Sequence, residues 1–205
     1  DIPLGPRKKL LKAIADLVSG PAGVVASESA VAPARRHDGE RRQLTVMFCD
    51  LVDSTALSTR MDPEDLRDVI RAYHEACAVT VESHGGYVAK YMGDGVMAYF
   101  GYPRAHEDDA RRAARAGIAI VHAVAMLDIG RHRAIESPLG VRVGIHTGLV
   151  VVGDVIGGSD GEPASVTGET PNVASLLQAL AVANEVVVCP LTRELMGEAF
   201  ACDDL

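Results

Sequence analysis

The chain has 205 residues, of which 48% are hydrophobic, and it carries a formal net charge of −8 at pH 7. This size and hydrophobicity suffice for one complete domain with a sizeable core and a further segment. The acidic balance argues against nucleic acid as a partner, because phosphate binding requires clustered cations. The sequence contains no apolar run of transmembrane length and no secretory signal pattern, which predicts a cytoplasmic protein without a membrane partner.

Cysteine usage points to the same compartment. The four cysteines show neither metal-ligand spacing nor the pattern of a disulfide framework. Two of them lie inside apolar runs, where a free thiol behaves as a small hydrophobic side chain. We therefore expect free thiols in a reducing cytosol.

The N-terminal part of the chain is expected to lie outside the main domain. Residues 1–18 predict a turn and a short amphipathic helix. This stretch is similar to the last helix of a sterile alpha motif domain, and an ordinary amphipathic start explains it equally well. Residues 19–39 are rich in Ala, Gly, Ser and Pro without periodicity, which is typical of a linker. The folded domain is therefore predicted over residues 40–205.

Apolar periodicity and turn residues predict an alternation of strands and helices in this domain. Pro63 suits the first position of a helix that Asp62 can cap, and Gly93-Asp94-Gly95 is a strong hairpin signal. The expected order is strand 44–49, helix from 54, helix 63–83, hairpin 87–100, helix to about 127, strands 139–147 and 149–156, helix from 171, strand 185–189 and helix from 191. This order predicts an α+β fold, with helices packed on a mostly antiparallel sheet and compatible with a ferredoxin-like core.

Two aspartates stand at the ends of predicted strands. Asp50 closes the apolar run 44–49, and Asp94 lies in the Gly-Asp-Gly turn of the hairpin. If these strands are neighbours, both carboxylates meet at one edge of the sheet. Such a pair either shifts its pKa values or binds a hard divalent cation. We favour the metal interpretation, since an aspartate inside an apolar strand is poorly explained as a turn or capping residue.

Five segments together resemble the class III nucleotidyl cyclase catalytic domain, the family of adenylyl and guanylyl cyclases, in its bacterial form. They are the strand that ends at Asp50 and residues 90–94, 141–148, 152–157 and 168–175. Five motifs in the family's order are far more specific than a lone glycine-rich loop. The resemblance covers residues 40–205 and implies the ferredoxin-like core of that family.

The resemblance implies that Asp50 and Asp94 bind two divalent cations per site, Mg²⁺ or Mn²⁺. Such cations activate the ribose 3′-hydroxyl of ATP and neutralise its triphosphate. Ser54 and Thr55 follow the strand at the start of a helix, where backbone N–H groups can hold phosphate oxygens. Arg142 matches a triphosphate-contacting arginine of the family, and an ordinary surface-strand arginine is the alternative.

Base and ribose recognition are implied at three further positions. Lys90 falls where the family discriminates bases, and an ammonium donates to the N1 acceptor of adenine. Ser165 occupies the partner position and can accept from the adenine 6-amino group. Asn172 lies in the first turn of a helix, with Thr170 expected as its N-cap, and matches the ribose-orienting asparagine of the family.

The sequence departs from the family pattern in two places. Four residues after Asn172 the family carries an arginine that stabilises transition-state charge on the α-phosphate, and here that residue is Leu176. The family also continues beyond residue 205 with a strand pair that carries a phosphate-binding lysine. The resemblance therefore implies that the last strands are missing from residues 40–205.

Two functions from different classes follow. The first is an adenylate cyclase that converts ATP to cyclic AMP and pyrophosphate at a homodimer interface. In the family, Asp50 and Asp94 of one chain would face Lys90, Ser165 and Asn172 of the other. The second is a weakly active or inactive cyclase-like module for nucleotide binding and dimerisation, which the missing arginine favours. A guanylate cyclase is disfavoured by the lysine at the base-reading position.

Overall fold

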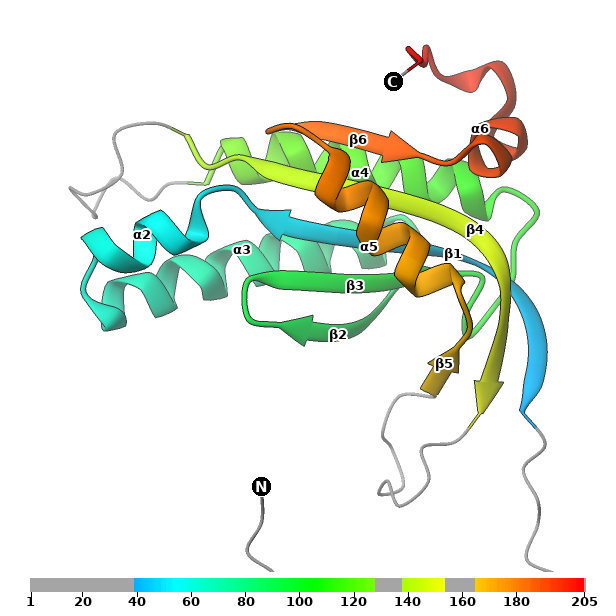
Figure 1. Ribbon diagram of the computed structural model, residues 1–205, viewed down its shortest axis with the longest axis horizontal. Helices are drawn as coiled ribbons and strands as arrows, with labels where there is room; N and C mark the ends of the chain where they lie inside the picture. Colours follow the sequence, from blue (N-terminus) through cyan, green and yellow to red (C-terminus); the bar gives the residue numbers. More distant parts are fainter. Residues whose placement is uncertain (1–38, 128–137, 154–164, 205) are drawn as a thin grey trace, which may run out of the picture. The chain divides into compact units, whose positions relative to one another are not determined.

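The computed structural model describes residues 39–127, 138–153 and 165–204, whose arrangement is shown in Figure 1. The predicted N-terminal helix at 1–18 and the linker lie outside the described residues. The elements are β1 (Glu40–Leu51), α2 (Ser54–Arg60), α3 (Pro63–Ser83), β2 (Tyr87–Met92), β3 (Gly95–Phe100), α4 (Asp109–Ala125), β4 (Val141–Gly153), β5 (Ser165–Thr167), α5 (Thr170–Leu180), β6 (Glu185–Val188), α6 (Pro190–Met196) and the 3₁₀ helix η1 (Gly197–Ala199).

The strands form one sheet in the order β2-β3-β1-β4-β5, and β6 also pairs with β4. The β4–β6 pairing is parallel, whereas β1 is antiparallel to both of its neighbours. In Figure 1, α5 crosses one face of the sheet, while α3 and α4 lie behind the strands on the other face. This is the predicted α+β fold, with helices on a mostly antiparallel sheet and a ferredoxin-like core.

Alternation along β1 decides which side chains face which helices. Met47, Cys49 and Leu51 are buried in the core that α3 and α4 cover. Leu44 and Val46 belong to the smaller core on the opposite face, together with Ala174 of α5. Because successive side chains of a strand point to opposite faces, residue 50 must share the α5 face with the even-numbered residues.

Helix α3 has a simple origin in the sequence. Proline stands at its first position, after Asp62 at the N-cap. Apolar residues then recur every four positions and are buried against the sheet, namely Val69, Tyr73, Cys77 and Val81. The prediction of this helix over 63–83 is confirmed. The Asp62 side chain makes no capping hydrogen bond, so the proline and the buried stripe are the features that account for the helix.

The prediction of two strands at 139–147 and 149–156 is wrong. One continuous strand, β4, runs through Gly148 to Gly153. The reason is its partner: β1 pairs with β4 from Glu40↔Val152 to Leu51↔Val141, which keeps the backbone at Gly148 extended. The additional strand in this part of the order is β5, which follows residue 164 and pairs with the end of β4.

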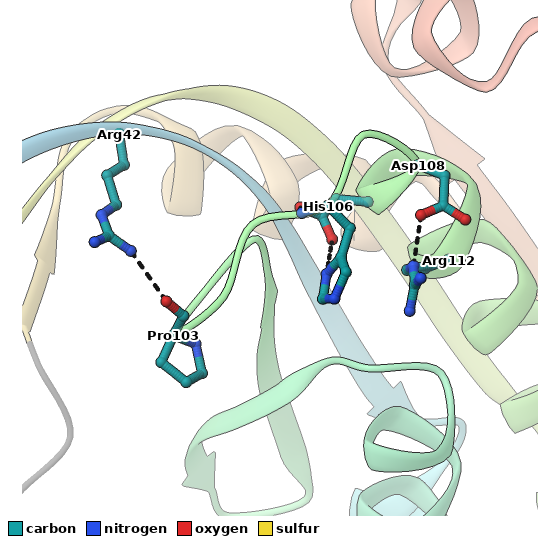
Figure 2. Close-up of polar contacts among 6 residues, drawn as sticks. Arg42, Pro103, His106, Asp108 and Arg112 are labelled. Atoms are coloured by element: carbon teal, nitrogen blue, oxygen red, sulfur yellow. Dashed lines mark hydrogen bonds and ion pairs between the residues drawn. The ribbon is translucent and has the colours of Figure 1, made fainter.

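One smaller expectation, about the start of α5, also differs. The N-cap of α5 is Glu169 rather than Thr170, whose buried hydroxyl donates to the Leu149 carbonyl oxygen at 3.0 Å. At the start of α4, Arg112 Nε donates to Asp108 Oδ1 at 2.6 Å, an i,i+4 pair that Figure 2 shows. Arg111, one residue earlier, donates to the Met196 carbonyl oxygen of α6.

Within the described ranges, no helix is long and apolar enough to cross a membrane.

Gly144 allows α5 to pack directly on β4. A Cβ atom at this position would lie 2.1 Å from the backbone nitrogen of Gln178 and 2.3 Å from the carbonyl oxygen of Ala174. Backbone atoms of a helix cannot yield as a flexible side chain can. We expect Gly144→Ala to lower the free energy of unfolding by about 3 kcal/mol, the upper end for an overpacked core.

Urea denaturation measures this effect, and Gly153→Ala is its control on the same strand. At Gly153 the nearest atom to an added Cβ is the Gly39 Cα at 3.6 Å, an ordinary contact. The control should therefore change the free energy of unfolding by less than about 1 kcal/mol. Equal effects of the two substitutions would contradict a tight α5–β4 contact.

Candidate active site

The candidate site is built on the pairing of β1 with β4. Asp50 and Arg142 are opposite each other in the register, and alternation places both on the α5 face. Arg142 Nη2 donates to Asp50 Oδ2 at 2.5 Å. Gln178 Nε2 of α5 donates to the same oxygen at 3.3 Å. The Asp50 side chain is only 24% exposed, so its carboxylate is held between a strand and a helix.

Asp94 comes to this carboxylate from the β2–β3 turn. Because β3 pairs with β1, the turn lies beside the end of β1, and the two carboxyl groups are close enough to share a hydrogen bond. Burial and then Asp94 raise the pKa of Asp50, and Arg142 opposes them. Burial also acts to raise the pKa of Asp94, but hydrogen bonds from Ser54 and Asp50 outweigh it and lower the value. The two carboxyl groups therefore act on each other's protonation, as two carboxyls this close must.

A sharp turn after β1 brings Ser54 to Asp94. Asp53 has φ +57° and ψ +22°, the left-handed conformation that non-glycine residues adopt at a cost of about 1–2 kcal/mol. The Asp53 side chain makes no capping hydrogen bond to α2. Ser54 begins this helix and its hydroxyl bonds Asp94, whereas Thr55 is exposed in the first turn. Strained backbone of this kind is often found at functional sites.

The donor set fits a hard divalent cation. Two carboxylates and the Ser54 hydroxyl offer only oxygen atoms, which Mg²⁺ and Mn²⁺ prefer. Two carboxylates this close hold a proton or need a positive partner. In the described parts of the chain, no three acidic, histidine or cysteine side chains form a metal cluster. Oxygen atoms of water or substrate phosphate would therefore have to complete the coordination.

Lys90 lies on β2, four residues before Asp94 on the same hairpin. Its side chain is exposed, and β2 stands at the end of the strand order. The pairing shifts register between Val88 and Lys90, since Val88 pairs with Ala98 and Lys90 pairs with Met97. Such a bulge redirects the side chain that follows it. The structure thus presents Lys90 at an open edge of the domain.

Ser165 and the metal-binding candidates are not brought together. Ser165 pairs with Gly153 at the last residue of β4, whereas Arg142 lies near the first residue of the same strand. At about 3.3 Å per residue, the span from Arg142 to Gly153 is on the order of 35 Å along the strand. Ser165 therefore cannot reach the carboxylate pair of its own chain.

Asn172 and Leu176 share the exposed face of α5. Asn172 lies in the first turn as predicted, and Leu176 follows one turn later on the same face. The Leu176 residue is 65% exposed, and so is Leu180, one further turn along. An exposed apolar stripe with an asparagine at one end is thus the outward surface of this helix.

Two residues near the carboxylate pair were missed in the sequence. Gln178 contacts Asp50 because α5 packs on Gly144, a contact between segments far apart in the chain. His74 of α3 faces the Gly93 carbonyl beside Asp94, and its ring lies 4.6 Å from the Tyr91 ring. Burial lowers the pKa of His74. No local signal distinguishes either residue, because neither spacing nor composition encodes these contacts.

Comparison with known proteins assigns the family. The family model described as the adenylate and guanylate cyclase catalytic domain matches residues 37–205. Adenylate cyclase 1 of Rhizobium meliloti (strain 1021) is 30% identical over 140 residues, which are 68% of this chain and 21% of that protein. The solved adenylyl cyclase CyaB from P. aeruginosa is 32% identical with a TM-score of 0.73, covering 80% of this chain and 85% of that one.

Similarity extends to guanylate cyclases as well. The solved guanylyl cyclase Cya2 is 29% identical with a TM-score of 0.70, covering 78% of this chain and 81% of that chain. The chain spans only 16 to 27% of the length of three curated relatives that it matches. The match nevertheless includes the whole described sheet and the helices packed on it. The chain thus belongs to the adenylate and guanylate cyclase catalytic domain family.

Proposed function

We propose that the domain is an adenylate cyclase, which converts ATP to cyclic AMP and pyrophosphate. The observation that carries the proposal is the Asp50–Asp94 carboxylate pair at the end of the sheet. Asp50 and Asp94 would hold two divalent cations, Mg²⁺ or Mn²⁺, which when bound activate the ribose 3′-hydroxyl and neutralise the triphosphate. Ser54 orients Asp94 through its hydroxyl.

The residues that follow β1 would bind the phosphates. Backbone N–H groups at the start of α2, at Ser54 and Thr55, have no partner within the helix and can donate to phosphate oxygens. Arg142 lies beside the carboxylate pair and carries a planar set of donors that suits phosphate oxygens. These contacts would position the triphosphate next to the carboxylates.

The proposed site requires two copies of the chain. Ser165 lies on the order of 35 Å along β4 from the strand position of Arg142, so one chain cannot place it beside the carboxylates. In a homodimer, Lys90, Ser165 and Asn172 of one copy would face Asp50 and Asp94 of the other. A two-fold axis would then generate two equivalent sites.

The choice of ATP rests on the chemistry of two side chains. The Lys90 ammonium is a donor only and matches the N1 acceptor of adenine, whereas guanine carries a hydrogen on N1. Ser165 can accept from the adenine 6-amino group. The four free cysteines fit a reducing compartment, and together with ATP as the substrate they support a cytoplasmic location.

Base preference supplies the test of this function. The parent chain with Mn²⁺ should bind ATP more tightly than GTP. Lys90→Glu should weaken ATP binding by roughly ten- to a hundredfold, the worth of one charged hydrogen bond, and should shift preference toward GTP. A carboxylate at this position can accept from the guanine N1–H and 2-amino group.

Nucleotide titrations by calorimetry measure both affinities. Arg71→Glu is the control, since it makes the same kind of charge reversal at an exposed residue of α3. It should leave the ratio of the ATP and GTP dissociation constants unchanged. Equal binding of ATP and GTP by the parent chain would contradict the assignment to adenine.

A second candidate function is a cyclase-like module that binds nucleotide and dimerises with little or no turnover. The observation in its favour is Leu176, which stands on the exposed face of α5 one turn after Asn172 and cannot donate a hydrogen bond. Measured cyclic AMP formation separates the two candidates.

A further inference from the structure

The most informative contact outside the expected roles is the one that Arg142 makes. The resemblance directs this arginine to the triphosphate, yet its guanidinium is bound to Asp50. We propose that Arg142 is the counter-ion of the Asp50–Asp94 pair in the metal-free protein, and that a divalent cation displaces it from Asp50 and frees it for the triphosphate. The inference rests on the proposed function, because it takes these two carboxylates as the metal ligands.

The coordination capacity of Asp50 supports displacement. A carboxylate oxygen has two lone pairs, and Asp50 Oδ2 already accepts from Arg142 at 2.5 Å and from Gln178 at 3.3 Å. Asp94 takes a further hydrogen-bonding position of the same carboxyl group. A cation that binds Oδ2 must therefore remove a donor. The charged donor is the one that the cation's own charge repels.

The geometry of Arg142 makes it the mobile partner. Its Nε is buried and has no hydrogen-bond partner within the described residues. An unpaired buried donor is costly, so the guanidinium is incompletely satisfied while it is bound to Asp50. Phosphate oxygens accept two parallel hydrogen bonds from a guanidinium and would satisfy it better. The side chain is still 34% exposed, which leaves it a path to a ligand on the surface.

The consequence is a coupling between metal and nucleotide. Metal binding releases Arg142, and a released Arg142 can bind phosphate, so each ligand should strengthen the other through this one side chain. Thermodynamic linkage requires the effect to be reciprocal. Removal of the guanidinium should then tighten the binding of metal alone and weaken the binding of nucleotide in the presence of metal.

The test begins with titrations of the full chain with Mn²⁺ in the absence of nucleotide. Electron paramagnetic resonance measures the free Mn²⁺ at each step and so gives the affinity. Arg142→Met should bind Mn²⁺ at least about tenfold more tightly than the parent chain, because no cation has to be displaced. Arg142→Gln, a milder change that keeps a donor, should shift the affinity in the same direction. Arg112→Met is the matched control: it removes the same charge from an Arg–Asp pair with a 2.6 Å contact, shown in Figure 2. It should leave Mn²⁺ affinity unchanged.

A second measurement separates displacement from simple charge repulsion. The guanidinium ¹⁵N–¹H signal of Arg142, assigned with Arg142→Met, should shift when diamagnetic Mg²⁺ is added to the parent chain. In Asp50→Asn the same addition should leave that signal in place. Tighter Mn²⁺ binding by Arg142→Met with an unmoved parent signal would overturn displacement, because charge alone would then explain the affinity.

The outcomes also distinguish this inference from the proposed function. If Mn²⁺ affinity depends on Asp50 but does not rise in Arg142→Met or Arg142→Gln, the inference is wrong and the metal site remains. If Asp50→Asn binds Mn²⁺ as tightly as the parent chain, the metal site itself is wrong and the inference falls with it.

Discussion

Either Asp50→Asn or Asp94→Asn should abolish Mn²⁺-dependent nucleotide binding and reduce cyclic AMP formation by at least about a hundredfold. Divalent cations supply several kcal/mol of charge stabilisation in phosphoryl chemistry, and each 1.4 kcal/mol corresponds to a factor of about ten in rate. An amide of the same shape keeps a hydrogen-bond acceptor for Arg142 or Ser54 but loses the charge that holds a cation. The fold should persist, since neither residue belongs to the buried apolar clusters and asparagine has nearly the same shape as aspartate.

Mn²⁺ titrations and nucleotide titrations measure this effect separately. Asp108→Asn provides the control, because it removes an aspartate charge from a surface ion pair with Arg112. That variant should bind Mn²⁺ and nucleotide as the parent chain does. Metal affinity that stays unchanged in both Asp50→Asn and Asp94→Asn would remove these residues from the site.

Leu176→Arg should raise turnover by roughly ten- to a thousandfold, the scale of one transition-state hydrogen-bond donor. Asn172 and Leu176 share an exposed helix face, so an arginine at 176 would project from the surface that carries the ribose-orienting candidate. Leu176 is 65% exposed, and an arginine can therefore replace it without repacking the core. Nucleotide affinity should barely change, because the new contact strengthens only as charge builds on the α-phosphate.

Steady-state kinetics divide the effect between kcat and KM. Leu180→Arg is the matched control, since Leu180 is equally exposed one turn further along α5 and receives the same charge. It should leave kcat unchanged. A gain in affinity without a gain in rate would mean that position 176 serves ground-state binding. A parent chain as fast as Leu176→Arg would mean that another cation already fills the role.

Much of the fold was predictable because its signals are local. The helix at 63–83 follows from a proline at its start and apolar residues at every fourth position. The hairpin at 87–100 follows from alternation around a Gly-Asp-Gly turn, and Gly93 there has φ +64°. Such signals involve residues that are close together in the sequence. They can therefore be recognised without knowing which helices or strands the segment will contact.

Strand length was not a local property. Gly148 interrupts the apolar pattern, and the sequence therefore predicts two strands that meet there. The long antiparallel pairing with β1 overrides this preference, since it supplies backbone hydrogen bonds along the whole of β4. A pairing between segments some hundred positions apart leaves no trace in either segment alone.

The candidate site likewise has features that the sequence predicts and contacts that only the folded structure reveals. The sequence by itself determined that Asp50 closes an apolar run, that Asp94 occupies a tight turn and that Leu176 stands four residues after Asn172, where the resemblance implies an arginine. Only the tertiary structure decided that Arg142 and Gln178 contact the Asp50 carboxylate and that Ser165 lies at the other end of β4. The physical reason is that motifs and periodicity act over a few residues, whereas cross-strand register and the packing of α5 on β4 depend on the whole folded sheet.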